Sequence, residues 1–191
     1  HDYLTAFLLG IVESITEFLP ISSTGHLILV NQWISFDKQF TILFDVVIQM
    51  GAILAVVVDF RKELFNFSNP ETLNLWKKII LAVIPSLAIG ALCYDTIEKT
   101  LFNPWVVAMA LVAGGLVLLL LEKKSVEKPI QTLEKLSFKT ALLIGLIQCI
   151  AMIPGTSRSA ATIIGAMLLG CSRVIAAEFS FFLAIPTMTA A

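Results

Sequence analysis

Long apolar segments separated by short polar ones dominate the pattern of this chain. Continuous apolar runs cover residues 41–60, where Asp45 and Gln49 interrupt them, and residues 76–94 and 104–121. A fourth run extends from about residue 174 to the end. Each is close to the ~20 residues that a helix needs to cross a bilayer. The pattern therefore predicts membrane-spanning helices.

Two further apolar segments, residues 4–34 and 139–172, have a different pattern. Each contains two apolar stretches of about 12 to 16 residues, hinged at Pro20 or Pro154, and these are too short to cross a bilayer singly. We interpret both segments as re-entrant helix hairpins. Irregular backbone at membrane depth is tolerated only inside protein or beside a wet cavity, so the hinges are expected inside the bundle.

The hairpins also resemble each other in sequence, over residues 10–26 and 145–159. Basic residues gather in two of the connecting loops, which places both loops in the cytoplasm by the positive-inside rule. The two hairpins then enter from opposite sides, as in an inverted repeat, and their tips can meet. The basic residues are Arg61, Lys62, Lys77 and Lys78 in the loop 61–78, and Lys123, Lys124, Lys128, Lys135 and Lys139 in the loop 123–139, whereas 95–103 has Lys99 alone.

The predicted fold is an all-α integral membrane protein with inverted-topology repeats, each a hairpin plus transmembrane helices. Residues 1–191 form one membrane domain, with repeat one at about 1–122 and repeat two at about 139–191. Because repeat two has one span where repeat one has three, we expect about two further spans of ~20 residues to follow residue 191.

Composition agrees with a bilayer environment. Hydrophobic residues make up 58% of the chain, charged residues 14%, and the mean hydropathy is +0.91. These values exceed those of soluble domains. A net charge of -1 argues against a nucleic-acid partner. The lipid bilayer is the expected partner, and the sequence leaves a homodimer open.

Glu13 and Glu17 are the first candidates for chemistry, since their spacing places both carboxylates on one helix face. Acidic residues at membrane depth are costly and are functional by default, and carboxylate oxygens suit magnesium or calcium. They predict a divalent-metal or proton site. A solvated position, or a structural ion pair with Arg158, is the alternative. In the second hairpin Gln148 takes the place of Glu13, and Met152 that of Glu17.

Small hydroxyl residues follow each hinge. A helix start presents unpaired backbone N–H groups that attract an anion such as phosphate. Arg158 adds a planar fork suited to phosphate oxygens, so two facing helix starts could hold a diphosphate. Simple N-caps are the alternative. The candidate substrate-binding residues are Ser22, Thr24, Gly155, Thr156, Ser157, Arg158, Ser159 and Gln148.

His26 follows Ser23 by three residues, so the two side chains are neighbours on one helical turn. His26 could take the proton of Ser23 and make it a nucleophile, or it could be hydrogen-bonded in the core or bind phosphate directly. Asp45 and Gln49 lie on one face of the next span. They could support the site or form a helix-packing hydrogen bond.

With Glu13-x-x-x-Glu17-Phe-Leu-Pro-Ile-Ser-Ser-Thr-Gly-His26 and Pro154-Gly-Thr-Ser-Arg158-Ser-Ala-Ala-Thr162, the chain closely resembles the undecaprenyl-diphosphate phosphatase family of the bacitracin-resistance type. The resemblance covers essentially all residues. It implies a bacterial plasma-membrane enzyme, open to the periplasmic side, that removes the terminal phosphate of undecaprenyl diphosphate and so recycles the lipid carrier for peptidoglycan. It also implies a divalent cation on Glu13 and Glu17, with Ser23, His26, Glu17 and Arg158 as catalytic residues.

Inverted repeats are above all a transporter plan. A lipid flippase or secondary transporter, with a cation-coupled anion site, is therefore the rival hypothesis. Ser23 beside His26, together with Arg158, favours the enzyme, because a carrier needs an anion site but no nucleophile and base.

Overall fold

The structure is a computed structural model that describes residues 2–101, 104–122 and 129–190. This part of the chain is helical and contains no β-strand, which confirms the predicted all-α class. Lys123, Lys124 and Lys128, used above as topology markers, lie outside the described residues. The helices are α1 (Asp2–Thr16), α2 (Ser23–Val30), α3 (Lys38–Asp59), α4 (Arg61–Phe65), α5 (Pro70–Leu101), α6 (Pro104–Glu122), α7 (Phe138–Gln148), the short 3-10 helix η1 (Cys149–Met152), α8 (Arg158–Leu168) and α9 (Arg173–Thr189).

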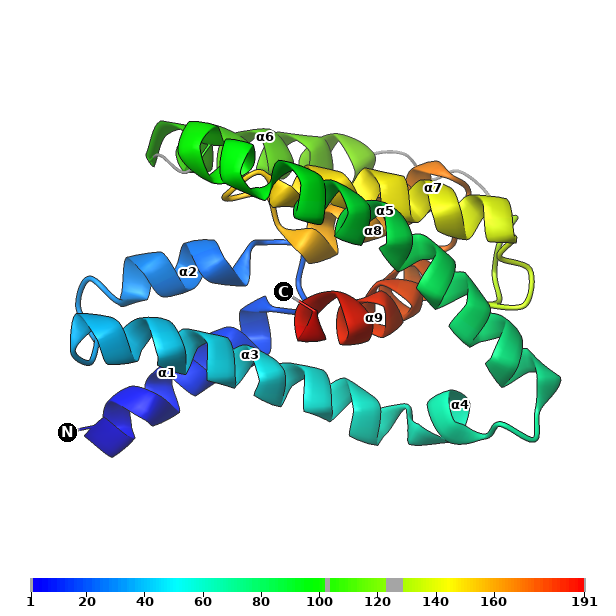
Figure 1. Ribbon diagram of the computed structural model, residues 1–191, viewed down its shortest axis with the longest axis horizontal. Helices are drawn as coiled ribbons and strands as arrows, with labels where there is room; N and C mark the ends of the chain where they lie inside the picture. The colour runs from blue at the N-terminus through cyan, green and yellow to red at the C-terminus, as the bar shows by residue number, and fades with distance from the viewer. Residues whose placement is uncertain (1, 102–103, 123–128, 191) are drawn as a thin grey trace.

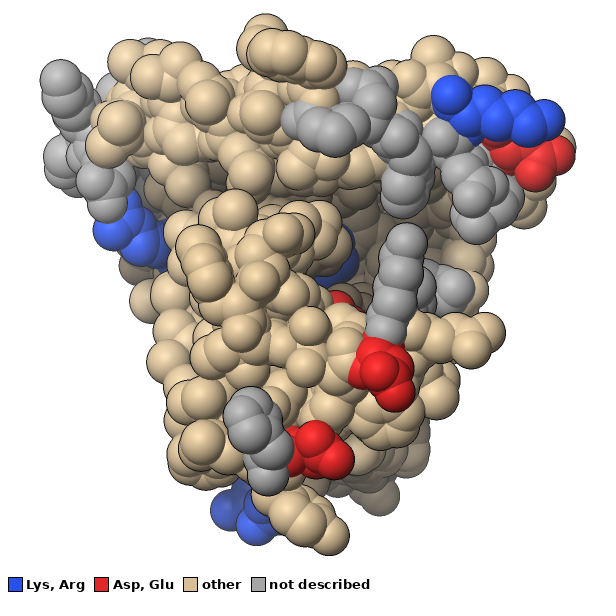
Figure 2. All heavy atoms as spheres, turned by 90° about the vertical axis from the view of Figure 1, so that its left-hand side faces the viewer, with Lys and Arg blue, Asp and Glu red and all other residues tan. Residues whose placement is uncertain are grey.

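Two helices are long and apolar enough to cross a membrane, over Gln39–Asp59 in α3 and Pro70–Cys93 in α5. A third span is possible in length and composition if the end of α5 and helix α6, which are bent by 90° at their junction, count as one. The last predicted span is the helix α9, which has 17 residues. Most of the face shown in Figure 2 carries neither acidic nor basic side chains, as lipid contact requires. The chain is a membrane protein.

Both predicted hairpins are present as pairs of short helices. The first is α1 and α2, which pack on each other, and the second is α7 with η1 followed by α8. Their breaks cover residues 17–22 and 153–157, around Pro20 and Pro154. Helix α2 has 8 residues and α8 has 11, fewer than the pattern predicted. The hinge residues therefore lie where the sequence placed them.

Helix α9 lies at the centre of the molecule, between α1–α3 and the group formed by α5, α7 and α8 (Figure 1). It contacts α3, α5 and α8. The core is formed by apolar side chains of α5, α7 and α9, among them Ile79, Val83, Ile144, Phe179, Phe182 and Leu183. Burial of this surface holds the second hairpin against α5 and α9.

Gly145 determines how closely α5 and α7 approach. A Cβ atom at this position would overlap the carbonyl oxygen of Ala82 on α5. Only glycine fits such a backbone contact. Small residues allow this kind of close helix packing in membrane proteins, where van der Waals contact replaces the hydrophobic effect.

The loop predicted over residues 61–78 is wrong in part. Residues 61–65 form α4, and α5 already begins at Pro70, so Lys77 and Lys78 lie in a helix. Lys78 is buried and donates hydrogen bonds from Nζ to the backbone carbonyl oxygens of Leu133 and Glu134, at 2.9 and 3.4 Å. The ammonium group of Lys78 is therefore held inside the fold by these carbonyl oxygens. It is not a solvent-exposed charge in a loop.

Candidate active site

A cavity of about 630 Å³ lies between the two hairpin breaks, α5 and the end of α9. We call it the polar cavity. Figure 2, which presents the left-hand side of the view in Figure 1, shows a hollow in this face with atoms of basic and acidic residues visible inside it. The polar residues that line the cavity are Glu17, Ser22, Ser23, Thr24, Gln49, Ser86, Gln148, Thr156, Ser157, Arg158, Ser159 and Thr187.

The first hairpin break ends at the N-cap of α2. Ser22 has a φ of 65°, a left-handed conformation that is uncommon for residues other than glycine, and its Oγ accepts a 3.3 Å hydrogen bond from the N–H of Gly25. Strained backbone of this kind concentrates at functional sites. The conformation directs Ser23, the first residue of α2, toward α1.

The Ser23 hydroxyl donates a 2.5 Å hydrogen bond to Oε2 of Glu17. Ser23 and Glu17 are both buried, with 7% of each exposed. A hydroxyl that already donates to a carboxylate has a proton acceptor in place. The predicted nucleophile is thus paired with an acidic residue of its own hairpin.

The second break ends in a similar way. Ser157 is the N-cap of α8 and its Oγ accepts a 3.1 Å bond from the N–H of Ala160. Gly155 has a φ of 89°, and a Cβ atom there would lie 2.6 Å from the carbonyl oxygen of Val107 on α6. Both the conformation and the close contact require glycine. Arg158 is then the first residue of α8.

Arg158 reaches across to the first hairpin. Its Nη2 donates to Oε1 of Glu17 at 2.8 Å, and its Nη1 donates to the carbonyl oxygen of Ser180 at 3.1 Å. Its Nε is buried without a partner. Glu17 therefore accepts a hydrogen bond from Ser23 on one carboxylate oxygen and from Arg158 on the other. The structural ion pair that the sequence left open is present.

The backbone of the two breaks is also joined. Ser159 Oγ donates a 2.8 Å hydrogen bond to the carbonyl oxygen of Leu19. Together with the ion pair, this confirms that the tips of the hairpins meet. The opposite membrane topology of the two repeats stays a prediction.

Ser23 Oγ donates to Glu17 and not to His26. His26 Nδ1 lies 2.8 Å from the carbonyl oxygen of Ser22, and since a carbonyl can only accept, Nδ1 carries the proton and donates it. His26 is half-buried and does not line the polar cavity. In the neutral ring with the proton on Nδ1, Nε2 carries no proton and can accept one. Of the three roles proposed from the sequence, the structure shows a hydrogen bond to the backbone.

Glu13 is the most completely buried acidic group near the site. It is 1% exposed, and neither of its carboxylate oxygens has a hydrogen-bond partner. It lies one helical turn before Glu17 and outside the lining of the polar cavity. Buried carboxylate oxygens without donors fit a hard cation. Among the described residues, however, no three His, Cys, Asp or Glu side chains come together as a metal site.

Asp45 and Gln49 make different contacts. Asp45 accepts a 2.9 Å hydrogen bond from Nδ2 of Asn31, the residue at the end of α2, and so links α2 to α3. Gln49 lines the polar cavity. One member of the pair thus forms the packing hydrogen bond and the other faces the site.

Gln148 connects three helices at the far wall of the cavity. Its Nε2 donates to Ser86 Oγ of α5 at 3.0 Å and to Thr187 Oγ1 of α9 at 3.3 Å. Both hydroxyls in turn donate to carbonyl oxygens of their own helices. Sequence reasoning missed Ser86 and Thr187. A signal was available, because each follows a proline inside an apolar helix, Pro85 in α5 and Pro186 in α9.

Most predicted site residues come together. Nine of the predicted catalytic and substrate-binding residues line the polar cavity together with Gln49, namely Glu17, Ser22, Ser23, Thr24, Gln148, Thr156, Ser157, Arg158 and Ser159. Glu13 and His26 lie behind that lining, and Gly155 lines a neighbouring apolar cavity. The arrangement joins the hydroxyl of Ser23, the carboxylate of Glu17 and the guanidinium of Arg158.

Comparison with known proteins gives a consistent result. Residues 6–191 match the family described as bacitracin resistance protein BacA. The chain is 52% identical over 197 residues to undecaprenyl-diphosphatase 2 of Shewanella oneidensis, covering 99% of this chain and 74% of that protein. It is 52% identical over 199 residues to undecaprenyl-diphosphatase 1 of Clostridioides difficile, covering 100% and 73%. The identity to the undecaprenyl-diphosphatase of Sphingopyxis alaskensis is 44% over 197 residues, with 100% and 74% coverage.

Proposed function

The chain belongs to the bacitracin resistance protein BacA family, and from this premise we propose that it hydrolyses undecaprenyl diphosphate to undecaprenyl phosphate and inorganic phosphate. This reaction would recycle the lipid carrier for peptidoglycan synthesis. One observation carries the proposal most directly: Ser23 is hydrogen-bonded to Glu17, which is itself paired with Arg158, at the wall of a cavity between two helix starts. A carrier has no use for a hydroxyl with a proton acceptor.

The residues of this chain support a two-step phosphoryl transfer. Glu17 takes the proton of Ser23 as the Ser23 oxygen attacks the terminal phosphorus, and the bond from that phosphorus to the bridging oxygen breaks. Undecaprenyl phosphate leaves. Water then attacks the phosphorus bound to Ser23, the bond to Ser23 breaks, and Glu17 returns the proton to the Ser23 oxygen. Both water protons leave with inorganic phosphate.

Arg158 and the backbone N–H groups at the starts of α2 and α8 would bind the phosphate oxygens. A guanidinium offers two parallel donors to a phosphate, and helix starts carry partial positive charge. The small residues Thr24 and Thr156 add hydroxyl donors from the cavity wall, whereas the Ser159 hydroxyl already donates to the Leu19 carbonyl oxygen. These groups stabilise the charge that spreads over the equatorial oxygens during transfer.

A divalent cation, magnesium or calcium, would be held by Glu13 and Glu17. The free buried oxygens of Glu13 support this assignment, whereas both oxygens of Glu17 also accept protein donors. When bound, the ion would neutralise phosphate charge.

We place the protein in the bacterial plasma membrane with the polar cavity open to the periplasmic side. The basic residues Arg61, Lys62 and Lys139 support a cytoplasmic position for their segments. Single cysteines at Lys99 and Lys139, in a chain without native cysteines, test this. Labelling of Lys99→Cys only from outside and of Lys139→Cys only from the cytoplasm is expected. The reverse result would overturn the orientation.

The activity is tested by phosphate release from undecaprenyl diphosphate with the purified full-length protein in lipid vesicles. Both products are measured, the lipid monophosphate by mass spectrometry and the phosphate by colorimetry. Ser23→Ala should abolish release, whereas Ser14→Ala, at an exposed serine of α1 that bonds only to the carbonyl of Gly10, should not. Absence of release by the unmodified protein, or movement of intact lipid across the vesicle without release, would favour the transporter.

A further inference from the structure

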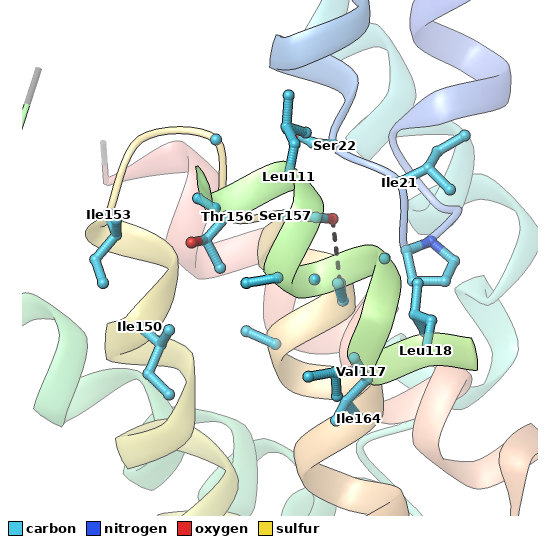
Figure 3. A pocket seen from close by; sticks show the side chains of 18 of the residues that line it. Ile21, Ser22, Leu111, Val117, Leu118, Ile150, Ile153, Thr156, Ser157 and Ile164 are labelled. Carbon is cyan, nitrogen blue, oxygen red and sulfur yellow. Dashed lines mark hydrogen bonds between the residues drawn. The ribbon is translucent and has the colours of Figure 1, made fainter. Parts of the chain in front are cut away.

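A second cavity, of about 920 Å³, lies beside the polar cavity and is lined almost wholly by apolar side chains. We call it the apolar cavity. Its walls are α6 on one side and the second hairpin, from Ile147 to Leu168, on the other. Figure 3 shows Leu111, Val117 and Leu118 of α6 facing the same space as Ile150, Ile153 and Ile164 of the hairpin. Its volume is at the upper end of the ~300–1,000 Å³ of small-molecule sites.

The apolar cavity borders the candidate active site. Ser22, Thr156 and Ser157 line both cavities. In Figure 3 these three residues lie toward one end of the space, and Val117 and Ile164 lie toward the other. A ligand that fills both cavities must therefore have a polar head at the hairpin breaks and an apolar tail that extends along α6.

Helix α6 is fixed close to the second hairpin at one end only. The Gly155 backbone is in close contact with Val107, and a Cβ atom at Gly25 would lie 3.3 Å from Leu111. Farther along α6, Gly114 and Gly115 line the cavity, and a Cβ atom at either would meet nothing within 4 Å. These glycines do not serve close helix packing, in contrast to Gly145. They leave open apolar space.

We propose that the apolar cavity binds the polyprenyl chain of the diphosphate substrate, with Gly114 and Gly115 determining how the chain passes along α6. The inference rests on the proposed function, which supplies a substrate with a charged head and a long hydrocarbon tail. Binding energy from the tail would anchor the diphosphate between the hairpin breaks, since remote binding can be used to orient the reacting group. Burial of hydrocarbon against Ile150, Ile153 and Ile164 supplies that energy.

The test compares two substrates with the same head, undecaprenyl diphosphate and geranyl diphosphate, on full-length Gly114→Leu and Gly115→Leu. A leucine at either position fills part of the cavity without a clash and improves helix propensity, so the fold should survive. We expect the KM for undecaprenyl diphosphate to rise about tenfold, the loss of roughly two buried methylene contacts. The kinetics with geranyl diphosphate should stay within about twofold.

Gly51→Leu in α3 and Gly10→Leu in α1 are matched controls, because a Cβ atom at these glycines also meets nothing within 4 Å and neither lines the apolar cavity. Both should leave the ratio between the substrates unchanged. Equal kinetics of all variants with both substrates would overturn the proposal and assign the space to ordinary membrane lipid.

A photoreactive polyprenyl phosphate with a diazirine in its tail gives a readout independent of turnover. Cross-links to α6, near Met109 to Leu118, are expected, and cross-links elsewhere would refute the assignment. If the unmodified protein hydrolyses neither substrate, the proposed function fails. The cross-linking result then still decides whether the cavity takes the chain.

Discussion

The hydroxyl of Ser159 donates its proton to the backbone carbonyl oxygen of Leu19 at 2.8 Å, and so joins two hairpins that are 140 residues apart. Ser159 itself is 2% exposed. The bond connects backbone to side chain at the point where both helices are interrupted. It is a second link between the hairpins, in addition to the ion pair of Glu17 with Arg158.

Ser159→Ala should therefore loosen the relation between the hairpins. The loss of one buried hydrogen bond typically costs about 0.5–1.5 kcal/mol, and the Leu19 carbonyl would keep the N–H of Ile21 as a donor but lose its link to the second hairpin. We expect a lower thermal midpoint and a reduced kcat, with Ser14→Ala as the control at an exposed serine. An unchanged kcat would show that the ion pair alone sets the geometry.

Arg158→Lys should lose nearly as much activity as Arg158→Ala. The guanidinium reaches Glu17 and the Ser180 carbonyl with two different nitrogens, which a single ammonium group cannot reproduce. We expect kcat to fall by ~10²-fold or more in both variants. Arg173→Lys, at an exposed arginine at the start of α9, is the control. Most of the rate surviving in Arg158→Lys would contradict a role for the fork.

Ser23 should carry phosphate during turnover. Acid quench of the protein mixed with undecaprenyl diphosphate, followed by peptide mass spectrometry, should find a phosphoryl group on Ser23 and none on the neighbouring Ser22. The expectation follows from the 2.5 Å bond between Ser23 and Glu17, which provides the proton acceptor. Appreciable hydrolysis by Ser23→Ala, with no phosphorylated peptide in the unmodified protein, would indicate direct attack by water.

A divalent cation should stabilise the protein through Glu13. Magnesium or calcium added to the metal-free protein should raise its thermal midpoint, because the ion supplies the partner that the buried carboxylate lacks. Glu13→Gln should abolish this shift, and Glu71→Gln, at an exposed residue of α5, should retain it. Chelator should also stop phosphate release. Full turnover in excess chelator would exclude the metal.

Gly145→Ala tests the packing of α5 on α7. The added methyl group would overlap the Ala82 carbonyl, so a loss of about 1–3 kcal/mol is expected, as for other overpacked cores. Gly10→Ala, at the corresponding place in the first hairpin, meets nothing within 4 Å and should be neutral or stabilising. Equal midpoints for the two variants would mean that α7 can move away from α5 without cost.

Local sequence signals were sufficient to locate the hairpins. Proline and the following hydroxyl residues marked both breaks, and Ser22 and Ser157 became N-caps as their residue types favour. An arginine in an apolar segment needs an anionic partner, and Glu17 is that partner. The N-caps depend on residues that are neighbours in sequence. The ion pair could be predicted because few acidic residues in apolar segments could serve as the partner of Arg158.

Features that depend on tertiary packing could not be predicted in the same way. The spacing of Ser23 and His26 allowed a contact, but the left-handed backbone at Ser22 turns its carbonyl to His26 and the Ser23 hydroxyl to Glu17. The sequence pattern places Lys78 in a loop, because nothing near it in sequence shows that the carbonyl groups of residues 133 and 134 lie beside α5. Such contacts between distant segments have no local signal.

The pairing of Glu17 with Arg158 gives the buried guanidinium a counter-ion within the protein. An isolated arginine at membrane depth would be costly, and the carboxylate acts as its counter-ion until a diphosphate arrives. In the reaction proposed above, substrate entry would exchange one anion for another at the same guanidinium. The reverse exchange would follow hydrolysis, with Glu17 pairing again with Arg158 as inorganic phosphate leaves. Such competition within the protein would limit inhibition by an anionic product.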